Sequence, residues 1–181
     1  MFNHLHTHSY YSFLEGIPSP ADLVQAAAQD GMRALALTDH RWLTGVVEFY
    51  DACQAAGVRP IIGLTLDVSI PEEFASLQLN KRAGLLTFLA MDRKGWSNLC
   101  RLSSAALSEP YYPARLPVPC RIIAENSQGL ICLTGGGHGL VTDLIAQGAE
   151  RAAGTWLGHL ADIFHDRMYI ELQHHRREDV L

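Results

Sequence analysis

Residues 34–40 read ALALTDH, and this segment decides the fold class. Its apolar run is typical of a short buried strand, and the Thr-Asp-His that follows places polar groups at the strand's carboxyl end. Five further segments are predicted as strands: residues 2–7, 60–68, 85–91, 129–134 and 168–172. Helices are predicted at residues 20–30, 44–56, 96–107, 140–146 and 155–164, and loops at 71–82 and 110–119. This alternation indicates parallel βαβ units in an α/β sheet or barrel, and six buried strands favour a barrel.

The first predicted helix has explicit start and end signals. Ser19 is a typical N-cap residue, Pro20 suits the first helical position, and Asp22 lies where a capping box places an acid. Gly31 is the expected end of this helix. In folds of this class, chemistry gathers where strands end and such helices begin.

The composition is that of one globular domain, residues 1–181, and it excludes several classes of protein. The net charge of −5, from 14 Lys+Arg and 19 Asp+Glu, disfavours tight nucleic-acid binding by this domain alone. No apolar run approaches the roughly 18–20 residues of a membrane span, and no secretory signal is recognised. The four cysteines lie far apart without a Cys-x-x-Cys pair. We therefore expect no disulfide framework, no membrane partner and a cytoplasmic location.

Histidine is the unusual feature, because three of the nine lie within the first eight residues. His4, His6 and His8 alternate along a predicted strand, and the side-chain period of two places them on one face. Such imidazoles can reach one metal ion or two neighbouring ions, and beside carboxylates they suit Zn, Mn or Fe. The alternative is a polar strand end with solvated histidines. We expect His6 and His8 as metal ligands and His4 as an additional contact.

The second predicted strand ends in Asp39 and His40. His40 is a candidate metal ligand, and Asp39 could bind the metal, orient an imidazole or only cap the following turn. Both residues are candidate catalytic groups. Glu15 lies seven residues beyond His8, in the loop expected to overhang the metals, where its carboxylate could bridge two ions.

Two weaker candidates are Asp67, which shares a strand face with Thr65, and His138, which follows three glycines. We consider both as additional metal or phosphate contacts, with solvated surface positions as the alternative. Glycines before a helix attract anions, but this turn lacks the Lys-Ser/Thr of a nucleotide P-loop. The sequence also lacks a Gly-x-Ser-x-Gly elbow and a Gly-x-Gly-x-x-Gly fingerprint. Metal-assisted hydrolysis is the chemistry that remains.

Several motifs, in their order and spacing, resemble the PHP (polymerase and histidinol phosphatase) domain. They are residues 6–9 (HTHS), 11–16 (YSFLEG), 36–40 (ALTDH) and 60–63 (PIIG). Residues 89–99 (LAMDRKGWSNL) and 169–173 (YIELQ) resemble the version of this domain in the bacterial DNA polymerase III alpha subunit. The resemblance runs along nearly the whole chain. It implies a distorted seven-stranded (β/α) barrel with a metal cluster at the strand ends, and ligands at His6, His8, Glu15 and His40.

The sequence also departs from the family pattern. Glu15 stands where the family usually has Asp, the third-strand acid falls at Thr65, the fourth-strand His near Leu85, and the ligand after the fifth strand near Gly136. The family's final Asp-x-His does not follow residue 172. We therefore expect zero to two divalent ions, weak or absent phosphoesterase activity, and a barrel truncated at its C-terminus, as in an N-terminal fragment of a longer polymerase chain.

The resemblance implies the PHP domain of a DNA polymerase III alpha-type subunit, whose parent performs DNA-directed nucleotidyl transfer in DNA replication. The domain would then be a metal-binding structural module with weak or vestigial 3′–5′ exonuclease chemistry. Its partners would be the rest of the polymerase chain, DNA through the parent protein, and other replisome subunits. The alternative is a free-standing PHP phosphoesterase acting on a small phosphate ester such as histidinol phosphate. An amidohydrolase barrel shares His-x-His, but nothing in the sequence matches its bridging Lys and late Asp.

Overall fold

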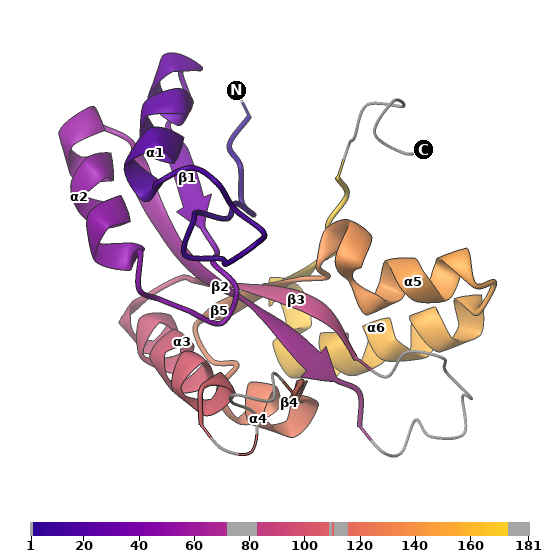
Figure 1. Ribbon diagram of the computed structural model, residues 1–181. Helices are drawn as coiled ribbons and strands as arrows, with labels where there is room; N and C mark the ends of the chain where they lie inside the picture. Colours follow the sequence, from indigo (N-terminus) through magenta and orange to yellow (C-terminus); the bar gives the residue numbers. More distant parts are fainter. Residues whose placement is uncertain (1, 72–82, 109, 111–115, 174–181) are drawn as a thin grey trace.

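The computed structural model describes residues 2–71, 83–108, 110 and 116–173 of the 181-residue chain. Most of the first predicted loop, residues 72–82, and half of the second, residues 111–115, therefore lie outside the described residues. The fold is α/β, with one sheet and helices packed against it (Figure 1). The strands along the sheet are, in spatial order, β1 (Ala34–Leu37), β2 (Arg59–Ser69), β3 (Ala83–Ala90), β5 (Leu130–Leu133) and β6 (Met168–Tyr169). A short strand, β4 (Val118–Pro119), pairs with β2 off this path.

The sheet is mixed, which corrects the prediction of parallel units throughout. β1 and β2 are parallel, as are β5 and β6, but β3 runs antiparallel to both of its neighbours, β2 and β5. Parallel neighbours need a crossover, usually a helix, whereas antiparallel neighbours do not. The sequence predicts a loop and no helix between β2 and β3, and an antiparallel neighbour needs no crossover helix there. Within the described residues, no β1–β6 pair closes the path.

The predicted strand at residues 2–7 is also wrong, although the segment lies beside β1. His4 accepts a backbone hydrogen bond from Ala36 and Thr7 accepts one from Thr38, both at 2.9 Å. The Thr7 amide, however, donates to the Thr38 hydroxyl at 3.0 Å, and the Thr7 hydroxyl donates to the Ala36 carbonyl. These side-chain bonds replace the regular ladder, so the segment is held in place without becoming a strand.

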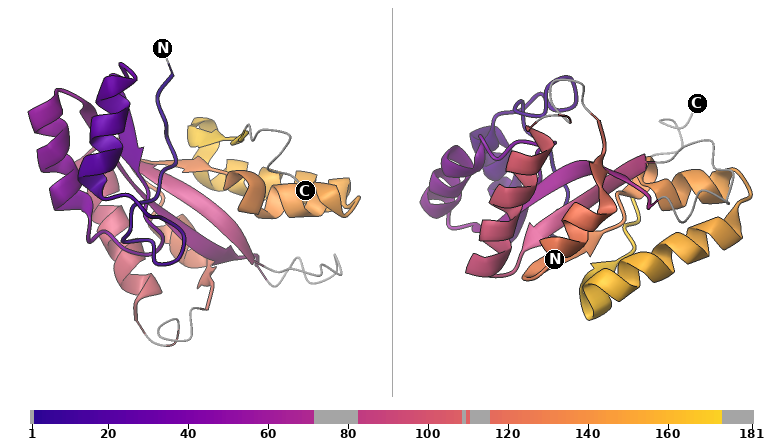
Figure 2. Two further views of the ribbon diagram at one scale, coloured as in Figure 1. Left: turned by 45° about the horizontal axis from the view of Figure 1, so that its top comes forward. Right: turned by 90° about the horizontal axis from the view of Figure 1, so that it is seen from below.

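Helices α1 (Pro20–Gln29) and α2 (Val46–Ala56) pack together beside β1 (Figure 2). The predicted capping box is confirmed, because the Ser19 hydroxyl accepts from the Asp22 amide at 3.1 Å and Asp22 accepts from the Ser19 amide at 3.0 Å. α2 ends at Gly57, whose φ of 69° lies in the left-handed region that favours glycine. Val24 and Phe49 are buried between these helices and the sheet.

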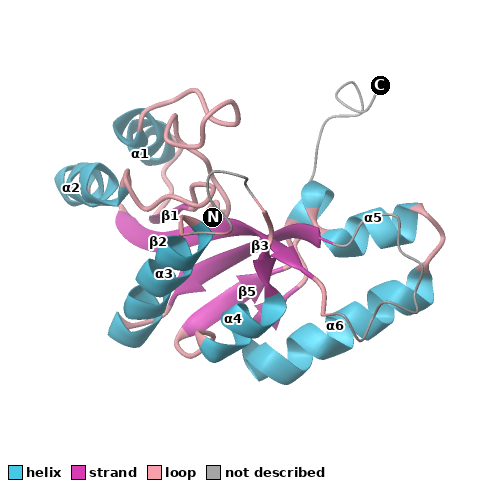
Figure 3. Ribbon diagram, turned by 60° about the horizontal axis from the view of Figure 1, so that its bottom comes forward, coloured by secondary structure: helices cyan, strands magenta, loops and turns pink. Residues whose placement is uncertain are grey.

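The other helices are α3 (Arg93–Ala106), α4 (Cys120–Glu125), α5 (Leu140–Ala146) and α6 (Glu150–Phe164). Figure 3 shows α3, α4 and α6 along one face of the sheet. α4 was not predicted, because it is only six residues long and follows directly on a proline-rich segment read as loop. α6 begins five residues earlier than predicted, and β6 ends three residues earlier, at Tyr169. The described residues contain no helix long and apolar enough to cross a membrane.

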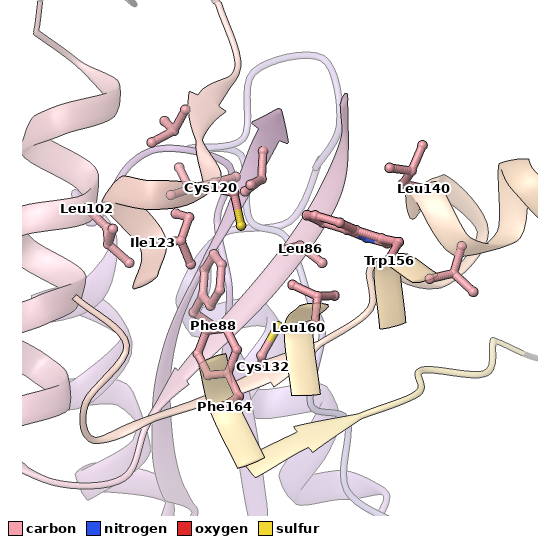
Figure 4. Close-up of a cluster of buried hydrophobic side chains, with 14 of the residues drawn as sticks. Leu86, Phe88, Leu102, Cys120, Ile123, Cys132, Leu140, Trp156, Leu160 and Phe164 are labelled. Carbon is pink, nitrogen blue, oxygen red and sulfur yellow. The ribbon is translucent and has the colours of Figure 1, made fainter. Parts of the chain in front are cut away.

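The main core lies between the sheet and this layer of helices (Figure 4). Leu86 and Phe88 of β3 point into it and meet Trp156 and Phe164 of α6, with the Phe88 and Phe164 rings stacked 5.9 Å apart. Because strand side chains alternate, Thr87, which lies between Leu86 and Phe88, faces the opposite side of the sheet. The packing of α6 fixes β6 and therefore the residues that follow it. The polar cluster described next lies on the face opposite this core.

Candidate metal centre

Imidazoles and carboxylates from distant parts of the chain meet on the sheet face opposite the main core. The N-terminal segment supplies His6 and His8, and the segment that follows β1 supplies His40. Asp67 comes from β2, and Glu171 comes from the segment that follows β6. The described part of the chain contains no group of three or more His, Cys, Asp or Glu side chains already arranged around one metal position. The protonation of each histidine therefore decides what the cluster can bind.

His6 is oriented by Glu171. Its Nδ1 lies 2.7 Å from Glu171 Oε1, and both side chains are 11% exposed. A carboxylate can only accept, so this bond assigns the proton of neutral His6 to Nδ1 and leaves a lone pair on Nε2. Beneath the ring, the Thr65 and Thr87 hydroxyls lie 3.4 and 3.5 Å from Nε2, too far for strong hydrogen bonds. This carboxylate–histidine arrangement is typical of histidines that bind a metal through the other nitrogen.

His8 has the same tautomer for a different reason. Ser12 Oγ donates to Asp39 Oδ1 at 2.6 Å, so it must accept from His8 Nδ1, which lies 2.9 Å away. Burial is the main cause that lowers the pKa of His8 from its ordinary value to about 4, and the neighbouring His6 is the second. His8 is therefore neutral at pH 7, with its proton on Nδ1 and a lone pair on Nε2.

The Nε2 atoms of His6 and His8 lie 2.9 Å apart. Two lone pairs at this distance repel unless a cation, either a proton or a metal ion, lies between the nitrogens. Nitrogens that share one Zn²⁺ at about 2.0–2.1 Å are separated by about 2.9 to 3.4 Å, depending on the coordination geometry. The spacing of the two rings therefore fits a shared divalent ion. This donor pair is the part of the cluster that a metal fits.

Glu171 is the functional residue that sequence reasoning missed. Besides bonding His6, its Oε1 accepts from Gln173 Nε2 at 2.9 Å, and its amide donates to the Thr134 hydroxyl at 3.0 Å. Burial alone would raise the pKa of Glu171, but the hydrogen bond and charge interaction with His6 lower it. Its Oε2 is buried and has no hydrogen-bond partner among the described residues. A signal was available, because Glu171 lies near the carboxyl end of the strand predicted at residues 168–172, and polar residues near strand ends are the candidates in this fold class.

Asp39 holds the loop that carries His8. This carboxylate is buried and accepts hydrogen bonds of 2.6–2.7 Å from the Ser9 amide, the Ser9 hydroxyl and the Ser12 hydroxyl. The Ser12 oxygen also accepts from the His40 amide at 3.0 Å. The structure therefore places Asp39 as the anchor that orients His8 and His40 through Ser12.

His40 lies between two carboxylates. Its Nδ1 is 2.8 Å from Glu15 Oε1, and its Nε2 is 3.0 Å from Asp67 Oδ2. Burial disfavours the charged ring, but the bonds to Asp67 and Glu15 outweigh it and raise the pKa of His40. Both contacts are hydrogen bonds only when the ring is an imidazolium, which has no lone pair for a metal. Burial would also raise the pKa of Asp67, yet His40 and Arg41 lower it to about 2.

The remaining candidates lie outside this cluster. His4 is exposed and packs edge-on against Phe2, with ring centroids 5.0 Å apart. His138 is exposed in the short helix η2 (Gly136–His138) after β5. Within the described residues, neither imidazole has a hydrogen bond or ion pair to the cluster. The structure thus brings together His6, His8, Glu15, His40 and Asp67, and leaves His4 and His138 apart.

The PHP domain family matches residues 4–175, nearly the whole chain. The chain belongs to the PHP family. It is 38% identical over 178 residues to the DNA polymerase III subunit alpha of Treponema pallidum and 37% identical over 182 residues to that of Thermus aquaticus. It is also 34% identical over 179 residues to that of Buchnera aphidicola. These matches cover 96–98% of this chain and 15% of each relative, so the chain spans about a seventh of their length.

Two solved structures have the same fold. One, from Bifidobacterium adolescentis, is described as a metal-dependent phosphoesterase; it has a TM-score of 0.51 at 15% identity, over 94% of this chain and 86% of the other. The second is an amidohydrolase from Chromobacterium violaceum with bound sulfate and no metal. It has a TM-score of 0.51 at 15% identity, over 98% of this chain and 88% of the other. At this identity the likeness concerns the fold alone.

Proposed function

We propose that this chain is the PHP domain of a DNA polymerase III alpha-type subunit and serves it as a structural module that binds one divalent ion between His6 and His8. The kinship with alpha subunits supports the first part, because it extends along nearly the whole chain at 34–38% identity. Domains of the parent outside these residues would carry out DNA synthesis. The partners would be the rest of that chain, DNA through the parent, and other replisome subunits, in the cytoplasm.

The facing Nε2 atoms of His6 and His8, 2.9 Å apart, are the observation that carries the metal proposal. Imidazole nitrogens suit Zn, Mn or Fe. When bound, such an ion would activate water and offset charge on a phosphate oxygen. Glu171 holds the proton of His6 at Nδ1, and Ser12 with Asp39 holds that of His8, so both Nε2 atoms are directed to one point.

We propose that phosphoesterase or 3′–5′ exonuclease chemistry is weak or vestigial here. Thr65 stands where the family's third-strand acid falls, and its hydroxyl faces that of Thr87 at 3.1 Å, so neither side chain supplies a carboxylate or imidazole ligand. Both ring nitrogens of His40 are hydrogen-bonded to carboxylates, so His40 is a poor base and a poor metal ligand in this arrangement. The alternative of a free-standing phosphoesterase rests on fold likeness to two distant structures. The prediction that His40 and Glu15 bind metal stays a prediction.

Metal content and activity measured together test this function. We expect protein purified without chelator to hold about one divalent ion per chain, and His6→Ala to lose it. His138→Ala is the matched control, because it removes an exposed imidazole outside the cluster. Manganese-dependent nucleotide release from single-stranded DNA and phosphate release from histidinol phosphate should both be weak or absent. Rapid turnover of histidinol phosphate would favour the free-standing enzyme, and three ions per chain would contradict the proposal.

A further inference from the structure

The half of the cluster around His40 contains a permanent positive charge of its own. Asp67 Oδ2 accepts from both His40 Nε2 and Arg41 Nη2, each at 3.0 Å. Glu15 bonds the other nitrogen of His40 at 2.8 Å. Two carboxylates and one imidazole are a donor set that could surround a divalent ion. Here the Arg41 guanidinium already places a positive charge 3.0 Å from Asp67 Oδ2. We call these four residues, Glu15, His40, Arg41 and Asp67, the His40 half.

Arg41 is held in this position by its backbone as well as its side chain. Its φ is 67°, a left-handed conformation that non-glycine residues rarely adopt. Its amide donates to the Thr65 carbonyl at 2.9 Å, and its carbonyl accepts from the Ser103 hydroxyl at 2.7 Å. Its Nη2 also donates to the Leu116 carbonyl at 3.2 Å, and its side chain is only 6% exposed. These contacts fix a guanidinium that does not lose its proton at any ordinary pH.

We propose that Arg41 is a built-in counter-cation that takes the place of a second metal ion in the His40 half. This inference rests on the proposed function in one point: the single ion of the wild-type protein binds in the other half, between His6 and His8. A divalent ion bound by Asp67 would lie within ion-pair distance of the guanidinium, and two like charges so close repel strongly in a buried site. Arg41 also uses the same Asp67 oxygen that bonds His40. The protein thereby limits its own metal stoichiometry through a residue that is not a ligand.

The proposal predicts that loss of the guanidinium opens a cation site. In Arg41→Gln the side chain keeps hydrogen-bonding capacity but loses its charge, so Asp67 and Glu15 are left with one imidazole between them. We expect this variant to bind one Mn²⁺ or Zn²⁺ more per chain than wild type. Arg151→Gln is the matched control, because it removes the same charge from an exposed position on α6. Arg41→Lys, which keeps the charge, should gain no ion.

Two measurements test whether Arg41→Gln gains an ion. Plasma mass spectrometry after equilibrium dialysis gives the metal equivalents per chain, and thermal unfolding gives the midpoint of each variant. The midpoint of Arg41→Gln should fall in chelator and recover with Mn²⁺, whereas that of Arg151→Gln should do neither. If Arg41→Gln does not fold in chelator, the proposal requires that Mn²⁺ restore folding. A variant unfolded under both conditions, or a folded one that binds no additional ion, would overturn it.

A double variant separates this proposal from the proposed function. His6→Ala removes the other half, so His6→Ala/Arg41→Gln should still bind one ion, now in the His40 half. If wild type binds no ion while the double variant binds one, the His6–His8 site fails and the role of Arg41 stands. If wild type binds one ion and the double variant none, the role of Arg41 fails and the first site stands. Adding Asp67→Asn to the double variant should abolish the gained ion.

Discussion

The hydroxyls of Thr65 and Thr87 lie 3.1 Å apart at directly paired positions of β2 and β3, beneath the ring of His6. Both residues are fully buried, so this pair forms a neutral polar floor for the candidate metal centre. A carboxylate at either position would add negative charge next to both histidines. The floor thus favours a site with few anionic ligands. Whether the two hydroxyls act as a pair can be tested in metal-free protein.

Thr65→Val should lower the free energy of unfolding by about 1–2 kcal/mol, because it leaves the buried Thr87 hydroxyl without its best partner. The double variant Thr65→Val/Thr87→Val should recover part of this loss, since valines pack well at paired strand positions and no hydroxyl is then stranded. Urea denaturation of the single and double variants in chelator measures both values. Strictly additive losses would show that the two hydroxyls do not act as a pair.

Glu171→Gln tests the residue that the sequence alone did not reveal. The amide can still contact His6 but removes the charge that holds the proton at Nδ1, so metal affinity should fall about 10–100-fold. Competition with a chromophoric chelator measures this affinity. Glu150→Gln, at the start of α6 and exposed, is the control for lost charge and should bind metal like wild type. Equal affinity in Glu171→Gln and Glu150→Gln would remove Glu171 from the site.

Asp39→Asn tests the anchoring of the loop. Asparagine cannot accept from Ser9 and Ser12 at both of its terminal atoms, so at least one buried bond is lost. We expect a loss of about 2–4 kcal/mol in the free energy of unfolding, because hydrogen bonds to a buried charge are among the stronger ones. The Ser9 amide should exchange its hydrogen faster in the variant. Unchanged exchange at Ser9 would show that Asp39 does not hold this loop.

The stability of the metal-free protein should depend on pH through His8. Its pKa is about 4 in the folded protein and about 6.5 when unfolded, so the unfolded state binds more protons between these values. The contribution of His8 to the free energy of unfolding is therefore greatest above pH 6.5, and it falls by about 2–3 kcal/mol as the pH drops to 4. His40, whose pKa is raised, contributes fully below pH 6.5 and loses its contribution only above it. Asp67 loses its contribution only below about pH 4.

Urea titrations in chelator at several pH values between 4 and 7 measure this dependence. His8→Gln does not titrate, so the difference in stability between wild type and His8→Gln should narrow steadily as pH falls. A constant difference across the window would mean that His8 keeps its ordinary pKa in the folded protein.

The features with local signals were the most predictable from sequence. The capping box at Ser19, the buried strand ending in Thr-Asp-His, and the His-x-His segment all follow from residue type and spacing. The segment at residues 2–7 was misread because its alternation is real but its hydrogen bonds go to threonine hydroxyls. The pairing of β3 could not be read from alternation alone, since it depends on what connects β2 to β3.

The site could be predicted in part for the same reason. His6, His8 and His40 are found by spacing within a segment, whereas the partners that decide their protonation come from far along the chain. Glu171 reaches His6 only because α6 packs against β3 and positions β6 beside β5. Arg41 reaches Asp67 through a left-handed backbone that no sequence pattern indicated. Long-range packing, and not ligand spacing, therefore determines which partners each histidine of the cluster has.

Anomalous diffraction from crystals of the wild-type chain soaked with Mn²⁺ tests the central claim most directly. We predict one anomalous peak, at bonding distance from both the Nε2 of His6 and the Nε2 of His8, with no peak between His40 and Asp67. A peak in the His40 half of the wild-type protein, or no peak at His6 and His8 under saturating Mn²⁺, would contradict the account.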